Sequence, residues 1–122
     1  MARLRTPSEA TEEWKRFTGR PHYAKLTLAA RPATSFSFHS AAGAWSSADE
    51  QDELESAVLD GVVQELLSTA ATPILGVAIT LVRAEVRPME ANQNAFFNAA
   101  RAATARLLAG ADGGPRENWE FA

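Results

Sequence analysis

The sequence predicts a single α+β domain, a two-layer α/β sandwich in which two helices pack on one face of a mainly antiparallel sheet. Three observations support this prediction. Stretches of apolar–polar alternation indicate half-buried strands, and apolar residues three and four positions apart indicate amphipathic helices. A chain of 122 residues with 46% hydrophobic content can also bury one core. No internal repeat or long linker divides the chain, so residues 1–122 are expected to form one domain.

The N-terminal segment is predicted to contain a short helix. Residues 6–9, Thr-Pro-Ser-Glu, have the spacing of a capping box with proline at the first helical position. This spacing predicts one or two helical turns over residues 7–16, and Gly19-Arg20-Pro21 would end them. We therefore interpret residues 1–18 as an N-terminal extension or a partial first strand or helix.

Two alternating stretches predict a β-hairpin. From Tyr23 to Arg31, Leu26 and Leu28 face one way while Lys25, Thr27 and Ala29 face the other. Residues 35–39, Ser-Phe-Ser-Phe-His, alternate in the same manner with both phenylalanines on one face. Because residues 32–34, Pro-Ala-Thr, can turn the chain between them, the two strands are predicted to pair.

The clearest helix is predicted after residue 46. Ser47 and Glu50 have the spacing of a capping box, and the acids of residues 49–53 suit the positive end of a helix dipole. Apolar residues follow at four-residue intervals, at Leu54, Val58, Val62 and Leu66, and the helix is expected to run to about Ser68. A second helix is expected over residues 92–109, with an inner face formed by Phe96, Ala99, Ala100, Ala103 and Leu107. Residues 111–122 are treated as a C-terminal tail.

A long central strand is predicted between the two helices, over residues 74–86. Val77, Ile79 and Leu81 lie on one face of it. Arg83 and Glu85 have the same parity, and charges on a buried face are costly. Two explanations stay open: a bulge changes the register, or the end of the strand projects past the core.

Charge is distributed unevenly along the chain. Residues 1–31 carry a net charge of +4 and the remaining residues −7, which gives −3 for the whole chain. One interpretation is a polarised surface that docks on RNA or on an acidic partner. The other interpretation is ordinary solvated charge that is unevenly spread.

Composition excludes several classes of protein. No segment approaches the roughly 20 apolar residues of a membrane-spanning helix, so no membrane partner is expected. The N-terminus is too polar and acidic for a secretory signal. With no cysteine, the chain has no disulfide framework and no thiolate nucleophile, and the reducing cytoplasm is the expected compartment.

Motifs for catalysis and cofactor binding are missing. The chain has no GxxxxGK[ST] and no GxGxxG motif, so no nucleotide is expected as a ligand. His22 and His39 have no acid at metal-ligand spacing, and no serine lies in a GxSxG motif. The crowded acids of residues 49–55 suit a helix cap and a solvated face better than acid–base chemistry. We expect no enzymatic activity, no cofactor and no metal.

Three stretches resemble domain IV of the elongation factor G family, which includes the tetracycline-resistance ribosomal protection proteins. Residues 18–25, TGRPHYAK, resemble the family's glycine-rich loop and the strand after it. Residues 57–66, AVLDGVVQEL, resemble the family helix. Residues 73–100 follow the family order of proline, apolar strand, tip loop and a helix that opens with Ala-Phe-x-x-Ala-Ala. The order and spacing of the stretches carry the resemblance.

This resemblance implies a fold of the ribosomal protein S-five second-domain type, with a left-handed β-α-β crossover. In the family this domain has no catalytic chemistry and reaches the ribosomal decoding site with its tip loops. By position, the tip here comprises residues 20–22 and 87–90. The family's GTPase does not fit in 122 residues, so the resemblance is to a stand-alone domain. Arg87-Pro88 stands where elongation factor G has a His-Asp pair.

The first functional hypothesis is a non-enzymatic, translation-factor-like domain that binds the ribosome or another RNA through its tip loops. Its candidate contacts are Arg20, His22, Arg83, Arg87 and Glu90. The alternative is a protein-interaction or homodimerisation module that uses the sheet face opposite the helices. Candidate contacts on that face are Lys25, Thr27, Ser37 and Thr80.

Overall fold

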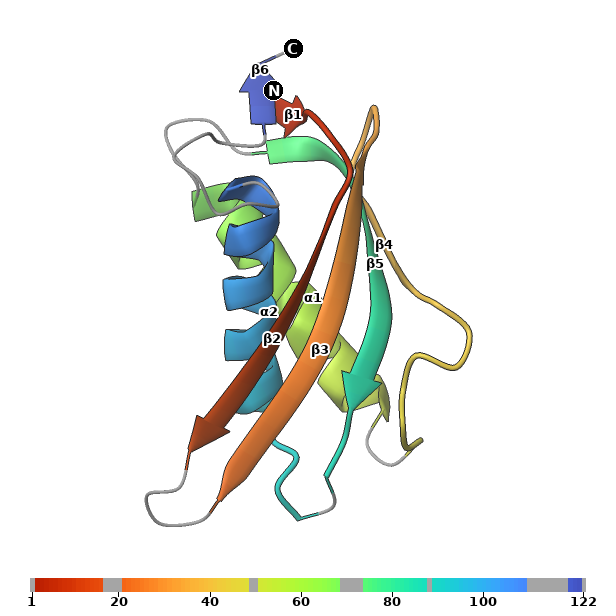
Figure 1. Ribbon diagram of the computed structural model, residues 1–122, viewed down its shortest axis with the longest axis vertical. Coiled ribbons are helices and arrows are strands. Elements are labelled where there is room, and N and C mark those ends of the chain that lie inside the picture. The colour runs from red at the N-terminus through yellow and green to blue at the C-terminus, as the bar shows by residue number, and fades with distance from the viewer. Residues whose placement is uncertain are drawn as a thin grey trace.

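A computed structural model describes residues 2–16, 21–48, 51–68, 74–87, 89–109 and 119–121. Within these residues, six strands form one sheet and two helices cover one of its faces (Figure 1). The strands are β1 (Ala2–Leu4), β2 (Ser8–Arg16), β3 (His22–Pro32), β4 (Ser37–Ser40), β5 (Ile74–Glu85) and β6 (Trp119–Phe121). The helices are α1 (Gln51–Ser68) and α2 (Gln93–Ala109). The predicted α+β class and two-layer sandwich are confirmed.

The long strand β5 forms the centre of the sheet. One edge of β5 pairs antiparallel with β3, which in turn pairs antiparallel with β2. The other edge of β5 pairs in parallel with β1 at its start and with β4 farther along. Strand β6 adds to the sheet beyond β1 in antiparallel orientation. The strand expected over residues 74–86 is therefore confirmed in both extent and position.

The predicted hairpin between residues 23–31 and 35–39 is wrong. Both segments contain strands, but β3 and β4 lie on opposite edges of β5 and do not pair with each other. The alternation of Leu26 and Leu28 with polar neighbours specified which face of β3 is buried, and this part is confirmed. Alternation carries no information about which strand lies beside which, so the pairing partner could not be read from it.

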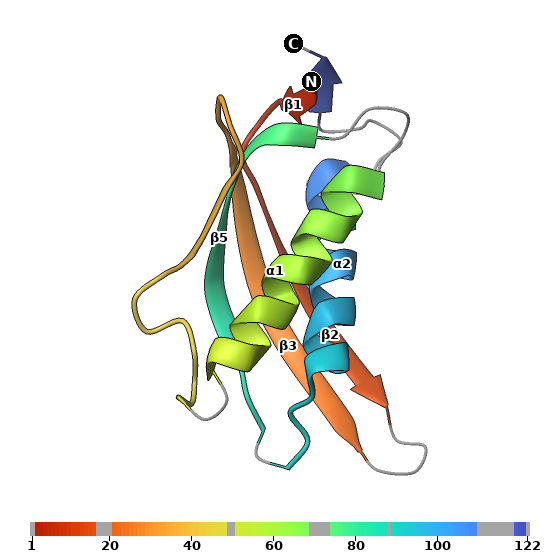
Figure 2. The same ribbon diagram turned by 180° about the vertical axis from the view of Figure 1, so that it is seen from behind.

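Strands β4 and β5 with α1 form a parallel β-α-β unit. In Figure 2, where the helices lie in front of the sheet, the chain descends along β4, rises through α1 and descends again along β5 to the right of β4. This path is a left-handed crossover, the rare hand for such a connection. The left-handed crossover implied by the resemblance is thus present in the structure.

The helix predicted over residues 7–16 is wrong, because this segment forms β2. All nine residues of β2 pair with β3, from Ser8 opposite Ala30 to Arg16 opposite His22. Burial alternates along it, with Ala10 buried and its neighbours exposed. The capping-box spacing gives only a weak local preference for helix. Hydrogen bonding along the whole length of a strand outweighs that preference. Strands β1 and β6, three residues each, had no sequence signal and lie in the segments expected to be terminal extensions.

Both predicted helices are confirmed. Helix α1 ends at Ser68, and its buried residues include the expected Leu54, Val58, Val62 and Leu66. Helix α2 begins after Asn92, whose Oδ1 atom accepts a hydrogen bond from the Ala95 N–H at 3.2 Å and so caps the helix. Its inner face is buried as expected, at Phe96, Ala99, Ala100, Ala103 and Leu107. Residues 49–50 of the predicted capping box lie outside the described residues.

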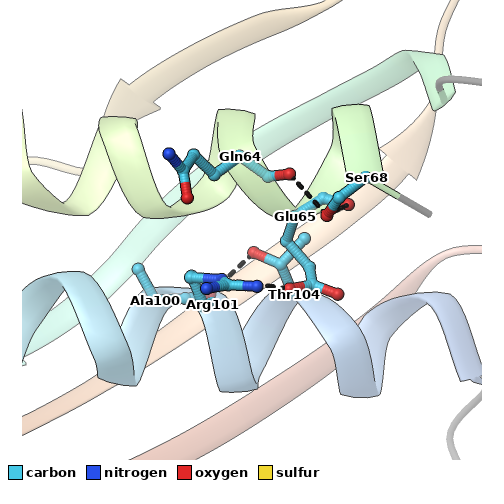
Figure 3. A network of polar contacts seen from close by, with 6 residues as sticks. All are labelled: Gln64, Glu65, Ser68, Ala100, Arg101 and Thr104. Carbon is cyan, nitrogen blue, oxygen red and sulfur yellow. Dashed lines mark hydrogen bonds and ion pairs between the residues drawn. The ribbon is translucent and has the colours of Figure 1, made fainter.

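The helices approach each other closely at Gly61. A Cβ atom at this position would lie 2.5 Å from the Phe97 carbonyl oxygen and 2.9 Å from the Ala100 Cβ atom. Nearby, Arg101 Nε on α2 lies 3.3 Å from Glu65 Oε1 on α1 (Figure 3). The buried Thr104 hydroxyl donates to the Ala100 carbonyl at 2.8 Å, so it leaves no unsatisfied group in the core.

A bulge in β5 settles the parity conflict in that strand. Thr27 lies opposite Arg83 and Leu28 lies opposite Leu81, so Val82 is an extra residue on β5. As a result Leu81 and Ala84 are both buried in the core, while Arg83 is exposed. Of the two explanations left open by the sequence, the bulge is confirmed.

The sheet has an open face and a distal end that the helices leave uncovered. The open face is the face away from the helices, and it carries Thr11, Lys25, Thr27 and Arg83. The distal end is the end at which β2 and β5 finish and β3 begins. There β2 and β3 extend beyond the helices (Figures 1 and 2). No helix among the described residues is long and apolar enough to span a membrane.

Candidate nucleic-acid interface

The structure brings three of the predicted tip residues together at the distal end. His22 begins β3, and Arg87 and Glu90 lie in the connection from β5 to α2. The Tyr23 N–H donates to the Glu90 carbonyl at 2.9 Å, which ties this connection to β3. Arg20 lies outside the described residues. The Nδ1 atom of half-buried His22 has no hydrogen-bond partner among the residues that the structure describes.

Tyr23 is the centre of the distal end, although sequence reasoning did not single it out as a site residue. Its side chain is only 2% exposed, and the Arg87 guanidinium lies over its ring, 3.6 Å from the centroid. Its hydroxyl lies 2.8 Å from Glu13 Oε2 and 3.0 Å from Glu85 Oε2. Tyr23 on β3 therefore connects β2, β5 and the connection that follows β5.

The electrostatics of this cluster keep Tyr23 neutral and Glu13 charged. Burial, together with hydrogen bonds to Glu13 and Glu85, raises the pKa of the Tyr23 hydroxyl well above its ordinary value. Hydrogen bonds from Lys15 and Tyr23 lower the pKa of Glu13, and the Lys15 Nζ atom lies 2.9 Å from Glu13 Oε1. Tyr23 consequently acts as a hydrogen-bond donor to carboxylates at neutral pH.

The connection after β5 makes a tight turn that presents Met89. The N–H groups of Glu90 and Ala91 donate to the Arg87 carbonyl at 3.1 and 2.9 Å. Met89 has a φ of 67°, a left-handed conformation that is uncommon for a residue with a Cβ atom, and its side chain is 85% exposed. The turn therefore leaves the Met89 side chain largely in solvent at the distal end. The expected tip range, residues 87–90, contains this position, but no pattern singled out Met89 within it.

A hollow of about 520 Å³, called here the distal hollow, extends on the open face from Lys25 and Glu85 near the distal end to Thr11 and Thr27 midway along β2 and β3. It is lined in part by Lys25 and Thr27, predicted for the sheet face, and by Arg83, predicted for the RNA contact. In the sheet register Lys25 lies opposite Glu85 and Thr27 opposite Arg83. One residue of the predicted RNA set, Arg83, therefore meets two of the predicted sheet-face set, Lys25 and Thr27, because the bulge at Val82 turns Arg83 to the open face.

The remaining sheet-face candidates lie elsewhere. Thr80 lines a second hollow, of about 430 Å³, together with Ala29 and Ala78. Ser37 is exposed on β4, opposite Ala78 of β5. These residues are three to five positions before Arg83 in the register of β5, so they are separate from the Lys25 hollow.

Positive charge without an ionic partner is concentrated at the distal end. Among the described residues, Lys25 and Arg83 form no ion pair, although Lys25 lies opposite Glu13 and Glu85 in the sheet register. The Arg87 guanidinium lies over the Tyr23 ring and likewise forms no ion pair with a described residue. By contrast, the α2 cations are paired, since Arg101 contacts Glu65 and Arg106 lies 2.9 Å from Glu12. Within the same described part of the chain, no group of three or more acidic or histidine side chains could hold a metal ion.

Comparison with known proteins identifies the fold alone. No protein-family model matches the chain, and no curated protein matches its sequence. The structure is similar to a crystal structure of a protein from Thermus thermophilus, with a TM-score of 0.73 and 17% sequence identity. The match covers 84% of this chain and 16% of that chain, so the present chain spans a small part of the length of its structural neighbour.

Proposed function

We propose that this protein is a non-enzymatic, cytoplasmic domain that binds the ribosome or another structured RNA with its distal end. The observation that carries the proposal is the Arg87 guanidinium, which is exposed, is stacked on Tyr23 and has no ion pair among the described residues. Stacking holds the guanidinium plane in place and leaves its N–H groups free for phosphate oxygens.

Support also comes from the surroundings of Arg87. The Tyr23 hydroxyl contacts two carboxylates, and the Tyr23 N–H donates to the Glu90 carbonyl. These contacts fix the ring on which the Arg87 guanidinium stacks. A cation held in one orientation loses less side-chain entropy on binding than a free one. The resemblance to domain IV of elongation factor G also favours the distal end as the RNA-binding surface, because the tip loops of that family contact the ribosome.

The alternative of a protein-interaction surface has less support on the open face. The large exposed hydrophobic side chains among the described residues are Leu67 and Met89, which lie at the end of α1 and in the distal turn. Neither lies on the open face. Its distal hollow has an apolar part, at Leu26 and Ala84, but the cations Lys25 and Arg83 and three hydroxyl side chains also line it, and these suit an anionic ligand.

Co-sedimentation with purified ribosomes over a series of salt concentrations tests the proposal. Arg87→Ala is compared with Arg106→Ala, which removes the same kind of side chain from α2, on the far side of the sheet. We expect Arg87→Ala to weaken binding and to reduce the slope of log affinity against log salt by about 1. Arg106→Ala should leave binding unchanged. Equal effects of the two variants, or no effect of Arg87→Ala, would contradict the proposal.

A further inference from the structure

We propose that the distal hollow on the open face is a second phosphate site, which takes a backbone phosphodiester of RNA and reads no base. The inference rests on the proposed function, and it adds a contact surface that the tip loops do not provide. Lys25 and Arg83 supply positively charged donors, and no described residue forms an ion pair with either of them.

Hydroxyl groups complete the donor set. The Thr11 and Thr27 Oγ1 atoms lie 2.7 Å apart, and one hydrogen bond between them leaves the hydrogen of the accepting hydroxyl available. Ser46 Oγ accepts from the Val86 N–H at 2.8 Å, so its own hydrogen also remains available. The lining therefore offers four donors of two kinds, cationic and hydroxyl. This combination is typical of sites that contact phosphate and sugar oxygens.

The lining also contains one acidic residue, Glu85, whose charge offsets one of the two cations, Lys25 and Arg83. Glu85 Oε2 lies 3.0 Å from the Tyr23 hydroxyl, and Tyr23 carries Arg87 on its ring. Glu85 and Tyr23 thus connect the hollow directly to the tip. An RNA strand that contacts Arg87 and continues across the open face would next meet Lys25 and Arg83.

Three neighbouring strands of the sheet line the hollow. Thr11 comes from β2, Lys25 and Thr27 from β3, and Arg83 from the bulged part of β5. The segment before α1 contributes Ser46 to the lining and is tied to β5, because the Ser46 N–H donates to the Ala84 carbonyl at 3.0 Å and the Ala84 N–H donates to the Ala44 carbonyl at 2.8 Å. Donors on such elements are positioned before the ligand arrives.

Size and lining favour a backbone over a base. At about 520 Å³ the hollow exceeds the space of a single phosphate group. Its lining residues are Thr11, Lys25, Leu26, Thr27, Ser46, Arg83, Ala84 and Glu85, none of them aromatic. A site that binds bases stacks them on aromatic rings. The chemistry present therefore recognises a sugar–phosphate segment without regard to sequence.

The test measures binding of fluorescently labelled oligouridine and oligoadenosine by anisotropy at several salt concentrations. The variant Lys25→Gln with Arg83→Gln keeps the exposed side chains similar in size, and far-ultraviolet circular dichroism confirms its fold. We expect about tenfold weaker binding of both oligonucleotides and a salt slope reduced by about 1.4, the value for two lost phosphate contacts to a single strand. Arg101→Gln, which removes a cation that pairs with Glu65 in the helix layer, is the control for loss of charge.

Three outcomes would overturn the inference. The double variant could bind RNA as the unmodified protein does while Arg87→Ala still weakens ribosome binding, in which case the proposed function stands without this site. A strong preference for one base would contradict backbone recognition. Competition by inorganic phosphate or uridine monophosphate as effective per phosphate as the oligonucleotide would assign the hollow to a small phosphorylated molecule instead.

Discussion

Replacing Gly61 by alanine tests the packing between the helices. In an unconstrained helix interior, alanine is favoured over glycine by about 1 kcal/mol. Here the added Cβ atom would lie 2.5 Å from the backbone carbonyl oxygen of Phe97, and backbone cannot rotate aside as a flexible side chain can. Overpacking of this kind costs about 1–3 kcal/mol, and a backbone clash belongs at the upper end. We expect Gly61→Ala to lower the free energy of unfolding by about 2 kcal/mol.

Thermal and urea unfolding followed by circular dichroism measure this change. In a domain of 122 residues the expected loss corresponds to a fall in Tm of about 6–10 °C. Ala102→Gly, at an exposed position of α2, calibrates the helix preference and should destabilise by about 1 kcal/mol. Adding Ala100→Gly to Gly61→Ala removes the contact at 2.9 Å, but it carries the same helix cost of about 1 kcal/mol and leaves the closer contact, so no net recovery is expected. A Gly61→Ala protein as stable as the unmodified one would refute the close helix approach.

Two further predictions concern the distal end. Tyr23→Phe removes the hydroxyl bonded to two carboxylates and should destabilise the domain by about 1–2 kcal/mol in urea unfolding at neutral pH. Because folding raises the pKa of Tyr23, the unfolded chain loses this proton first, and the unmodified protein should lose stability above about pH 10 more steeply than Tyr23→Phe. Met89→Gly relieves a left-handed backbone and should stabilise by up to about 1 kcal/mol, which differential scanning calorimetry would detect; a lower Tm would contradict the assigned φ.

Periodic segments of the sequence predicted their elements well. The four-residue spacing of Leu54, Val58, Val62 and Leu66 located α1, and the alternation around Leu26 and Leu28 indicated the correct buried face of β3. Spacing of this kind arises because the apolar positions are the buried ones, so the buried residues of the structure match it. The choice of pairing partner for a strand produces no comparable spacing in the sequence. The chain shows nothing in residues 35–39 to reveal that β4 lies against β5 instead of β3.

The candidate site was predicted only in part, because it is formed by residues from different strands. Arg83 was singled out by its conflict with the parity of β5, and Lys25 and Thr27 by their parity in β3. Their convergence depends on the bulge at Val82, which the sequence allowed but did not require. Tyr23 and its contacts join residues from three strands, and such long-range contacts have no sequence spacing by which they could be recognised.

Site-directed photo-crosslinking on purified ribosomes tests the central claim most directly. A photoreactive residue replaces Met89, which is 85% exposed at the distal end, or Leu67, which is 52% exposed near the end of α1 at the other end of the helix layer. If the distal end binds ribosomal RNA, position 89 should yield RNA crosslinks that disappear at high salt, and position 67 should yield none. RNA crosslinks from position 67 alone, or only protein crosslinks from position 89, would contradict the claim.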